Sequence, residues 1–234
     1  MAIRTNRTLL TWQEAAQRLA VSERRISALC AAGLLESFSA GNGVLVTEDS
    51  VRRQARYQGA GGRPYSPDMA FAVLYVLSGL EAPWLGRQQR YRLKGYLERM
   101  DVENLIRLVR RRATMIEYWC RDSNLGMVSD SIRISAATGS LTGSFQLAAS
   151  DRVEGYAAAD ALDDIVRQCR LKQGVTPIRV RLHAADDLPA GEGPMPLGVC
   201  AVDLAESDDP RERRAGRVAL QRLIDEYHHK EHQH

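Results

Sequence analysis

Apolar residues near the start of the chain recur at the three- and four-residue spacing of short helices. Thr11 and Glu14 have the spacing of a capping box, and apolar residues at 15, 16 and 19 follow as the inward stripe of a first helix. After a turn at 20–21, Ser22 is a good N-cap for a second helix over about 23–32, with Gly33 in the position that ends a helix. Within this second helix, Arg24, Arg25 and Ala28 share the face opposite the apolar residues.

The next segment predicts a hairpin and then a third helix. Two β-type runs, 34–38 and 44–46, flank Asn42-Gly43, a pair that tolerates the positive φ of a tight turn. Residues 47–50 then cap a helix that carries Arg52, Arg53 and Arg56. The order helix–turn–helix–hairpin–helix predicts a winged helix-turn-helix domain.

This segment resembles the excisionase and MerR-type DNA-binding domains. The resemblance lies in 14–26 (EAAQRLAVSERRI), in 32–35 (AGLL), in the hairpin and in 47–51 (TEDSV). In those families the helix after the Val-Ser turn enters the major groove and the hairpin flanks it. The resemblance therefore implies that Ser22, Arg24, Arg25, Ser27 and Ala28 face DNA, although the hairpin tip, with Asn42, lacks the usual basic side chain. A solvated helix face is the alternative for the two arginines.

A glycine-rich break separates this segment from a helical one. Residues 59–65 are read as a linker, in which Arg63 is either a minor-groove contact or plain linker. Beyond it, Ser66-Pro67-Asp68 starts an apolar helix to about residue 80, and two further helices are expected over 87–100 and 102–120. The last of these would carry arginines on one face, either against a DNA backbone or in solvent: Arg107, Arg110, Arg111 and Arg112.

In the last part of the chain, strand and helix signals alternate. Strands are expected over 131–136, 144–148, 152–156, 177–182 and 197–204, and helices over 159–171 and 210–227. The predicted class is thus α+β. The expected parts are a winged helix-turn-helix domain (1–58), a Gly-rich linker (59–65), a helical middle segment (66–122) and a small C-terminal α/β domain (123–234).

Composition is that of a globular chain, with 44% hydrophobic and 26% charged residues. The net charge of +3 is uneven, because 1–65 carry nine Lys/Arg against five Asp/Glu, whereas 123–234 carry 13 against 17. This basic front and acidic back suggest a surface for a polyanion in the first part, with ordinary scatter of charge as the alternative. The four cysteines are scattered, and neither a secretory signal nor a membrane span is evident, so we expect a cytoplasmic protein with no membrane partner.

Candidate enzymatic chemistry is sparse. Asp203 and Glu206, placed at the end of an expected strand, form a carboxylate pair of the kind that holds Mg²⁺. The Gly-Ser element of nucleotidyltransferases and the lysine of common nuclease cores are both missing from around this pair. His183 is the only histidine outside the tail, and the His-rich run 228–234 is read as solvated. We therefore expect no catalytic residue, no metal site and no cofactor.

Taken as a whole, the chain resembles the actinobacterial helix-turn-helix proteins grouped with AbiEi-type antitoxins of type IV toxin–antitoxin systems. The resemblance lies in 62–70 (GRPYSPDMA), 78–79 (SG), 82–85 (APWL) and 201–216 (AVDLAESDDPRERRAG). It implies that the N-terminal domain binds double-stranded DNA at its own promoter and represses it. It also implies that the C-terminal domain counters a nucleotidyltransferase toxin.

The resulting interpretation is a sequence-specific repressor and autoregulatory antitoxin, in which Arg52, Arg53 and Arg56 supply backbone contacts. Two alternatives stay open. One is a nucleic-acid-processing enzyme that uses Asp203 and Glu206, and the other is an excisionase-like protein that bends DNA. A homodimer also stays open, because helix-turn-helix proteins often pair on palindromes, yet no heptad seam marks an interface here.

Overall fold

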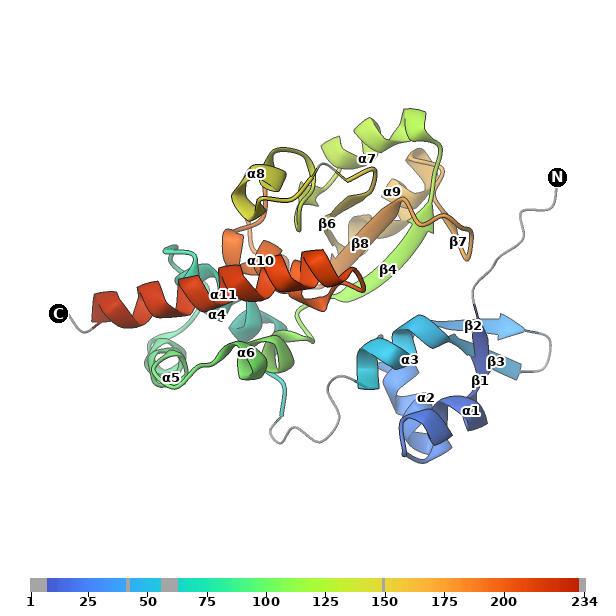
Figure 1. Ribbon diagram of the computed structural model, residues 1–234, viewed down its shortest axis with the longest axis horizontal. Coiled ribbons are helices and arrows are strands. Elements are labelled where there is room, and N and C mark those ends of the chain that lie inside the picture. The colour runs from blue at the N-terminus through green and yellow to red at the C-terminus, as the bar shows by residue number, and fades with distance from the viewer. Residues whose placement is uncertain (1–7, 41–42, 56–62, 149, 232–234) are drawn as a thin grey trace.

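The computed structural model describes residues 8–40, 43–55, 63–148 and 150–231 (Figure 1). The fold is α+β, as the sequence predicts: a small region at the N-terminus is followed by a larger body of helices and one sheet. Asn42, Arg56 and residues 59–62 of the expected linker lie outside the described residues. In the parts of the chain that are described, no helix combines the length and apolar character needed to cross a membrane.

The N-terminal region consists of two helices, a hairpin and a third helix, as expected, with one additional short strand. Its elements are β1 (Leu9–Thr11), α1 (Trp12–Arg18), α2 (Glu23–Ala31), β2 (Ser37–Ala40), β3 (Gly43–Thr47) and α3 (Glu48–Ala55). The three strands form an antiparallel sheet in the order β1-β3-β2.

Local signals explain why these elements begin and end where they do. The predicted capping box is present, since the Thr11 side chain accepts from the Glu14 amide and Glu14 accepts from the Thr11 amide at 2.8 Å. Ser22 caps α2 by accepting from the Arg25 amide, and Gly33 follows the helix with φ of +66°. Buried apolar side chains of both helices, the hairpin and α3 form a separate small core.

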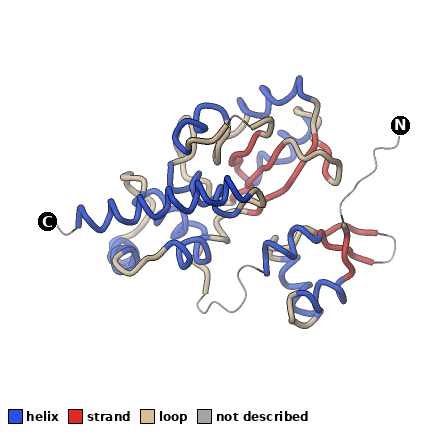
Figure 2. The backbone as a smooth tube through the Cα atoms, viewed as in Figure 1, coloured by secondary structure: helices blue, strands red, loops and turns tan. Residues whose placement is uncertain are grey.

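The larger body is built around a five-stranded sheet in the order β5-β6-β8-β4-β7 (Figure 2, strands in red). Its strands are β4 (Thr114–Trp119), β5 (Arg133–Ile134), β6 (Val153–Ala158), β7 (Lys172–Gln173) and β8 (Val180–Ala185). The central strands β6 and β8 run parallel, with Glu154 opposite Arg181 and Tyr156 opposite His183, and β4 runs antiparallel to β8.

Helices from both the middle and the end of the chain share the main hydrophobic core. They are α4 (Pro67–Leu77), α5 (Arg87–Leu97), α6 (Val102–Val109), α10 (Leu197–Glu206) and α11 (Pro210–Glu231). Helices α10 and α11 cross closely at Gly216, where an added Cβ would come within 2.4 Å of the Ala201 carbonyl oxygen. Segment 66–122 and the acidic part that follows it therefore pack as one body.

Shorter helical segments complete the body. They are η1 (Asp122–Asn124), α7 (Leu125–Asp130), η2 (Gly139–Leu141), α8 (Thr142–Phe145), η3 (Ala159–Ala161) and α9 (Leu162–Gln168). The last two correspond to the helix expected over 159–171.

Three predicted elements are wrong. The helix expected over 102–120 ends at Val109, and residues 114–119, which are rich in β-branched and aromatic side chains, form strand β4. The strand expected over 197–204 is helix α10, which is buried on all sides and therefore has no amphipathic period to reveal it. In place of the strand expected over 144–148, residues 144–145 end helix α8, Gln146 closes it in the left-handed region, and 147–148 are loop.

Candidate functional sites

The first candidate site is the exposed face of α2. Ile26 and Leu29 are buried and fix the helix to the rest of the N-terminal region, whereas Arg24, Arg25 and Ala28 are exposed. Ser22 is also exposed, and Ser27 is half-buried. Neither the Arg24 nor the Arg25 guanidinium forms an ion pair or a hydrogen bond with any described residue. Both cations are therefore presented to solvent on the first turn of the helix.

The other predicted DNA contacts are placed differently. Arg52 is exposed but pairs with Asp49 one turn earlier on α3. The Arg53 side chain is only 17% exposed, and its Nη1 lies 3.3 Å from Asp208 Oδ2, which ties the N-terminal region to the larger body. Arg53 thus lies at a contact between the two parts of the chain rather than on an open surface. Arg63, the candidate minor-groove contact, is exposed.

The second candidate site is a buried polar cluster that the sequence does not predict. It lies where the sheet faces α10, and its charged members come from strands β4, β6 and β8, from α10 and from the turn after α6. They are Glu117, Glu154, Arg181, Asp203, Glu206 and Arg112, and His183 of β8 lies among them.

Asp203 is the centre of this cluster. Its side chain is fully buried, and its Oδ1 accepts from the Tyr156 hydroxyl at 2.8 Å and from Arg112, while Oδ2 accepts from Ser135. The same Arg112 nitrogen, Nη2, donates to Glu206 at 2.7 Å, and Arg112 Nε donates to the Tyr156 hydroxyl at 2.7 Å. Arg112 therefore connects both carboxylates of α10 to the sheet.

Arg112 remains charged despite complete burial. Burial by itself lowers the pKa of a guanidinium, but the charge of Glu206, together with Tyr156 and Asp203, outweighs it and raises the pKa of Arg112 above its ordinary value. This arrangement bears on the enzyme alternative, because a guanidinium already lies between Asp203 and Glu206 at the position that Mg²⁺ would take. The geometry disfavours that pair as a magnesium site.

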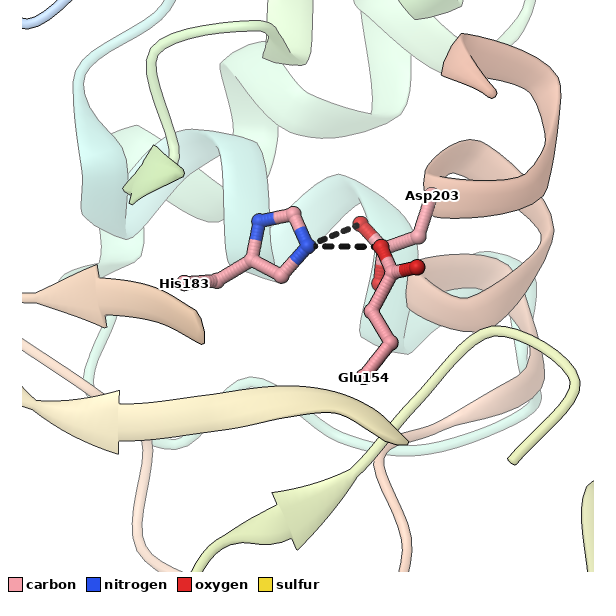
Figure 3. A group of neighbouring side chains, drawn as sticks. All are labelled: Glu154, His183 and Asp203. Atoms are coloured by element: carbon pink, nitrogen blue, oxygen red, sulfur yellow. Dashed lines mark hydrogen bonds and ion pairs between the residues drawn. The ribbon is translucent and has the colours of Figure 1, made fainter. Parts of the chain in front are cut away.

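Glu154 and His183 form the second half of the cluster (Figure 3). His183 Nε2 lies 2.9 Å from Glu154 Oε1 and 3.9 Å from Asp203 Oδ1. Burial would raise the pKa of Glu154, but the hydrogen bond from His183 and the charge of Arg181 lower it to about 2. Because Glu154 is an ionised acceptor, His183 Nε2 carries the proton and donates it.

Arg181 closes the cluster on the sheet side. Its Nε donates to Glu117 at 3.0 Å, and its Nη1 lies 3.8 Å from Glu154 Oε2. Burial lowers the pKa of Arg181, yet the charges of Glu154 and Glu117 outweigh it and raise the pKa above its ordinary value. The His183 ring also stacks on Tyr156, with centroids 4.6 Å apart, so its orientation is fixed.

A cavity of about 110 Å³ opens onto this cluster. The larger body contributes Glu154, His183 and Asp203 to its lining, and the N-terminal region contributes Glu36, Ser50, Arg53 and Gln54. The cluster is therefore buried but reached by a small polar cavity that lies between the two parts of the chain. Among the described residues, Glu154, His183 and Asp203 are the group whose ligand atoms lie close enough to hold a metal ion.

No protein-family model, curated protein or solved structure matches this chain.

Sequence reasoning misses the cluster because its members are far apart in the chain and the sequence predicts a strand where the structure has α10. One signal was available: charged or polar residues at alternate positions of apolar strands, Glu154 with Tyr156 in β6 and Arg181 with His183 in β8. Side chains two apart lie on the same face of a strand, so this pattern predicts a shared polar face on neighbouring strands.

Proposed function

We propose that this protein is a sequence-specific, double-stranded DNA-binding repressor whose N-terminal region is a winged helix-turn-helix domain with α2 as its recognition helix. The observation that carries the proposal is the pair Arg24 and Arg25, both exposed on the first turn of α2 and without an ionic partner among the described residues. An exposed guanidinium at the start of a recognition helix can bond bidentately to a guanine edge or to phosphate.

The neighbouring elements support this assignment. The β2–β3 hairpin follows α2 in the place of a wing, and α1 packs against α2 through the small core. The cap at Ser22 fixes the orientation of the first helical turn, so both arginines leave the helix from a defined position. A defined position matters because a bidentate contact to one base requires it.

We further propose that the protein is the autoregulatory antitoxin of a toxin–antitoxin operon, acting in the cytoplasm and countering a nucleotidyltransferase toxin. This step depends on the resemblance to AbiEi-type antitoxins and on the DNA-binding proposal. Co-expression of the chain with the neighbouring gene tests it. If expression of the neighbouring gene alone stops growth and co-expression of the full chain restores it, the proposal is supported. Growth that stays inhibited would contradict the antitoxin role but not the DNA-binding proposal.

The direct test of DNA binding is a titration of labelled promoter DNA with the Arg24→Ala, Arg25→Ala double variant. A base-reading arginine contributes about 1–3 kcal/mol, so each lost contact is expected to weaken binding roughly 5- to 150-fold. If one arginine contacts phosphate instead, its loss weakens binding to all duplexes and lowers the salt dependence.

The matched control is the double variant Arg167→Ala, Arg222→Ala, which removes the same charge from exposed side chains on the larger body (74% and 61% exposed). It is expected to bind the promoter nearly as well as the unaltered protein. Equal affinity of the Arg24, Arg25 variant and this control would exclude α2 as the recognition helix.

A further inference from the structure

Three potential ligand atoms converge at the bottom of the cavity between the two parts of the chain. Glu154 comes from β6, His183 from the neighbouring strand β8 and Asp203 from α10 (Figure 3). One oxygen or nitrogen of each lies within 4.8 Å of the others. The side chains are largely buried, with exposed fractions of 14% for Glu154, 6% for His183 and none for Asp203.

We propose that Glu154, His183 and Asp203 bind a divalent transition-metal ion, with Zn²⁺ as the best match, and that the cavity supplies an open coordination position. The inference is independent of the proposed DNA binding, so either can fail without the other.

The spacing of the ligand atoms suits a tetrahedral ion. With bonds of about 2.0–2.2 Å, two ligands of a tetrahedral zinc lie about 3.3 Å apart. The distances from His183 Nε2 to Glu154 Oε1 and to Asp203 Oδ1 are 2.9 and 3.9 Å, on either side of that value. Side-chain adjustments of under 1 Å, on the order of a small torsion change, would equalise these two distances.

The charge of the cluster favours a dication. Four carboxylates (Glu117, Glu154, Asp203 and Glu206) stand against two guanidinium groups (Arg112 and Arg181), which leaves a net charge of −2 when His183 is neutral. Three more charged residues line the cavity, Arg53, Arg110 and Glu36, and Arg53 pairs with Asp208 beside it. These two positive and two negative groups leave the net charge unchanged. An uncompensated buried negative charge destabilises the fold, and a bound divalent cation would neutralise the net charge of the cluster.

The ligand types narrow the choice of ion. One imidazole nitrogen with two carboxylate oxygens suits Zn²⁺ and neighbouring first-row ions, whereas Ca²⁺ and Mg²⁺ prefer sets made of oxygen alone. Three protein ligands with a fourth position open to water is the arrangement of zinc sites that act on a substrate. The cavity of about 110 Å³ has room for a few water molecules at that position.

The surrounding contacts already hold the ligands in place. Tyr156 stacks on the His183 ring and donates to Asp203, and Ser135 and Arg112 also donate to Asp203. Such outer contacts orient ligands in metal sites. His183 Nε2 now donates to Glu154, so the ion would replace this hydrogen bond while the single ring proton moves to Nδ1.

The test must separate this site from the histidine-rich tail, which can bind Zn²⁺ by itself. The working background is the full chain with His229→Gln, His232→Gln and His234→Gln, while His228 is kept because its Nε2 lies 2.8 Å from the Leu97 carbonyl oxygen. In this background we expect calorimetry with Zn²⁺, and metal analysis after dialysis, to give one ion per chain.

Variants of the ligands then locate the ion. Glu154→Gln and His183→Gln are each expected to weaken Zn²⁺ binding by at least about tenfold. Even substitutions of residues that only orient a metal ligand weaken binding by about 10- to 100-fold, so loss of a ligand should cost at least the lower value. Glu192→Gln, at an exposed position, is the matched control and should bind as the background does. Mg²⁺ in place of Zn²⁺ should give no comparable affinity.

Co²⁺ provides a readout that does not require a folded variant. Bound by one nitrogen and two oxygens with an open position, Co²⁺ should give ligand-field absorption in the unaltered background, and Zn²⁺ should displace it. The proposal is overturned if the background binds no stoichiometric ion, if no such absorption develops, or if folded Glu154→Gln binds Zn²⁺ as tightly as Glu192→Gln.

Discussion

Arginine side chains meet opposite environments in the two parts of this molecule. On α2, Arg24 and Arg25 are exposed and have no ionic partner among the described residues. Under α10, the Arg112 side chain is 3% exposed and donates to Asp203, Glu206 and Tyr156, and Arg181 is 10% exposed beside Glu117 and Glu154. The first pair is available to a partner, and the second is already used within the fold.

The comparison teaches that residue type alone does not distinguish a binding arginine from a structural one. Arg112 stands in the run Arg110-Arg111-Arg112, which looks as basic and as solvated in the sequence as Arg24-Arg25. What separates them is whether carboxylates from distant elements converge on the guanidinium. An exposed cation contributes little to the free energy of unfolding, whereas a buried cation destabilises the fold unless carboxylates pair with it.

The largest expected effect is on stability. Arg112→Met leaves Asp203 and Glu206 buried without their cation, and breaking a buried pair in this way costs about 3–5 kcal/mol. The same substitution at Arg24 or Arg25 is expected to change the free energy of unfolding by under about 0.5 kcal/mol. Urea unfolding followed by circular dichroism measures both. Similar losses at the two positions would remove the distinction between the two regions.

The second effect is a pH dependence of the buried region. The pKa of Glu154 is lowered from 4.5 to about 2, so Glu154 stabilises the fold above pH 4.5 and loses that contribution as the pH falls toward 2. At about 1.4 kcal/mol per pKa unit, the contribution is on the order of 3 kcal/mol. Glu154→Gln should therefore be less stable than the unaltered protein at pH 7, and the gap should narrow as the pH approaches 2.

Glu226→Gln on α11, where the carboxylate is 53% exposed, is the control for that measurement. Its unfolding free energy should follow that of the unaltered protein at every pH. A gap for Glu154→Gln that stays constant between pH 7 and pH 2 would show that ionisation of Glu154 does not stabilise the fold.

The same comparison explains how far the sequence could predict the structure. In the N-terminal region the decisive signals act over a few residues: the capping box at Thr11, the cap at Ser22, Gly33 after α2 and the two neighbouring β-type runs that pair as a hairpin. Such signals can be recognised in a single sequence. The α+β class also follows from local periodicity.

The buried cluster could not be predicted in this way. Residues 112, 154, 183 and 203 meet only because β6 and β8 pair in parallel and α10 packs over them. Helix α10 is apolar nearly all round and therefore has no helical period in the sequence. Its residues predict a strand, which places Asp203 wrongly. Contacts between distant segments decide the cluster. The alternating polar residues of β6 and β8 predict a polar face on each strand, but they do not show which other segments meet it.

The smallest expected effect concerns Arg53, whose environment is intermediate between those of Arg24 and Arg112. Its side chain is 17% exposed and pairs with Asp208, which is 31% exposed, at 3.3 Å. Partly solvated pairs contribute little, so a double-mutant cycle with Arg53→Ala and Asp208→Ala should give a coupling energy of about 0.5–1 kcal/mol in urea unfolding. Because Arg53 is engaged with Asp208, Arg53→Ala alone should weaken promoter binding less than Arg24→Ala does. A loss of DNA affinity as large as that of Arg24→Ala would mean that the ion pair opens on DNA and that Arg53 belongs with the binding arginines.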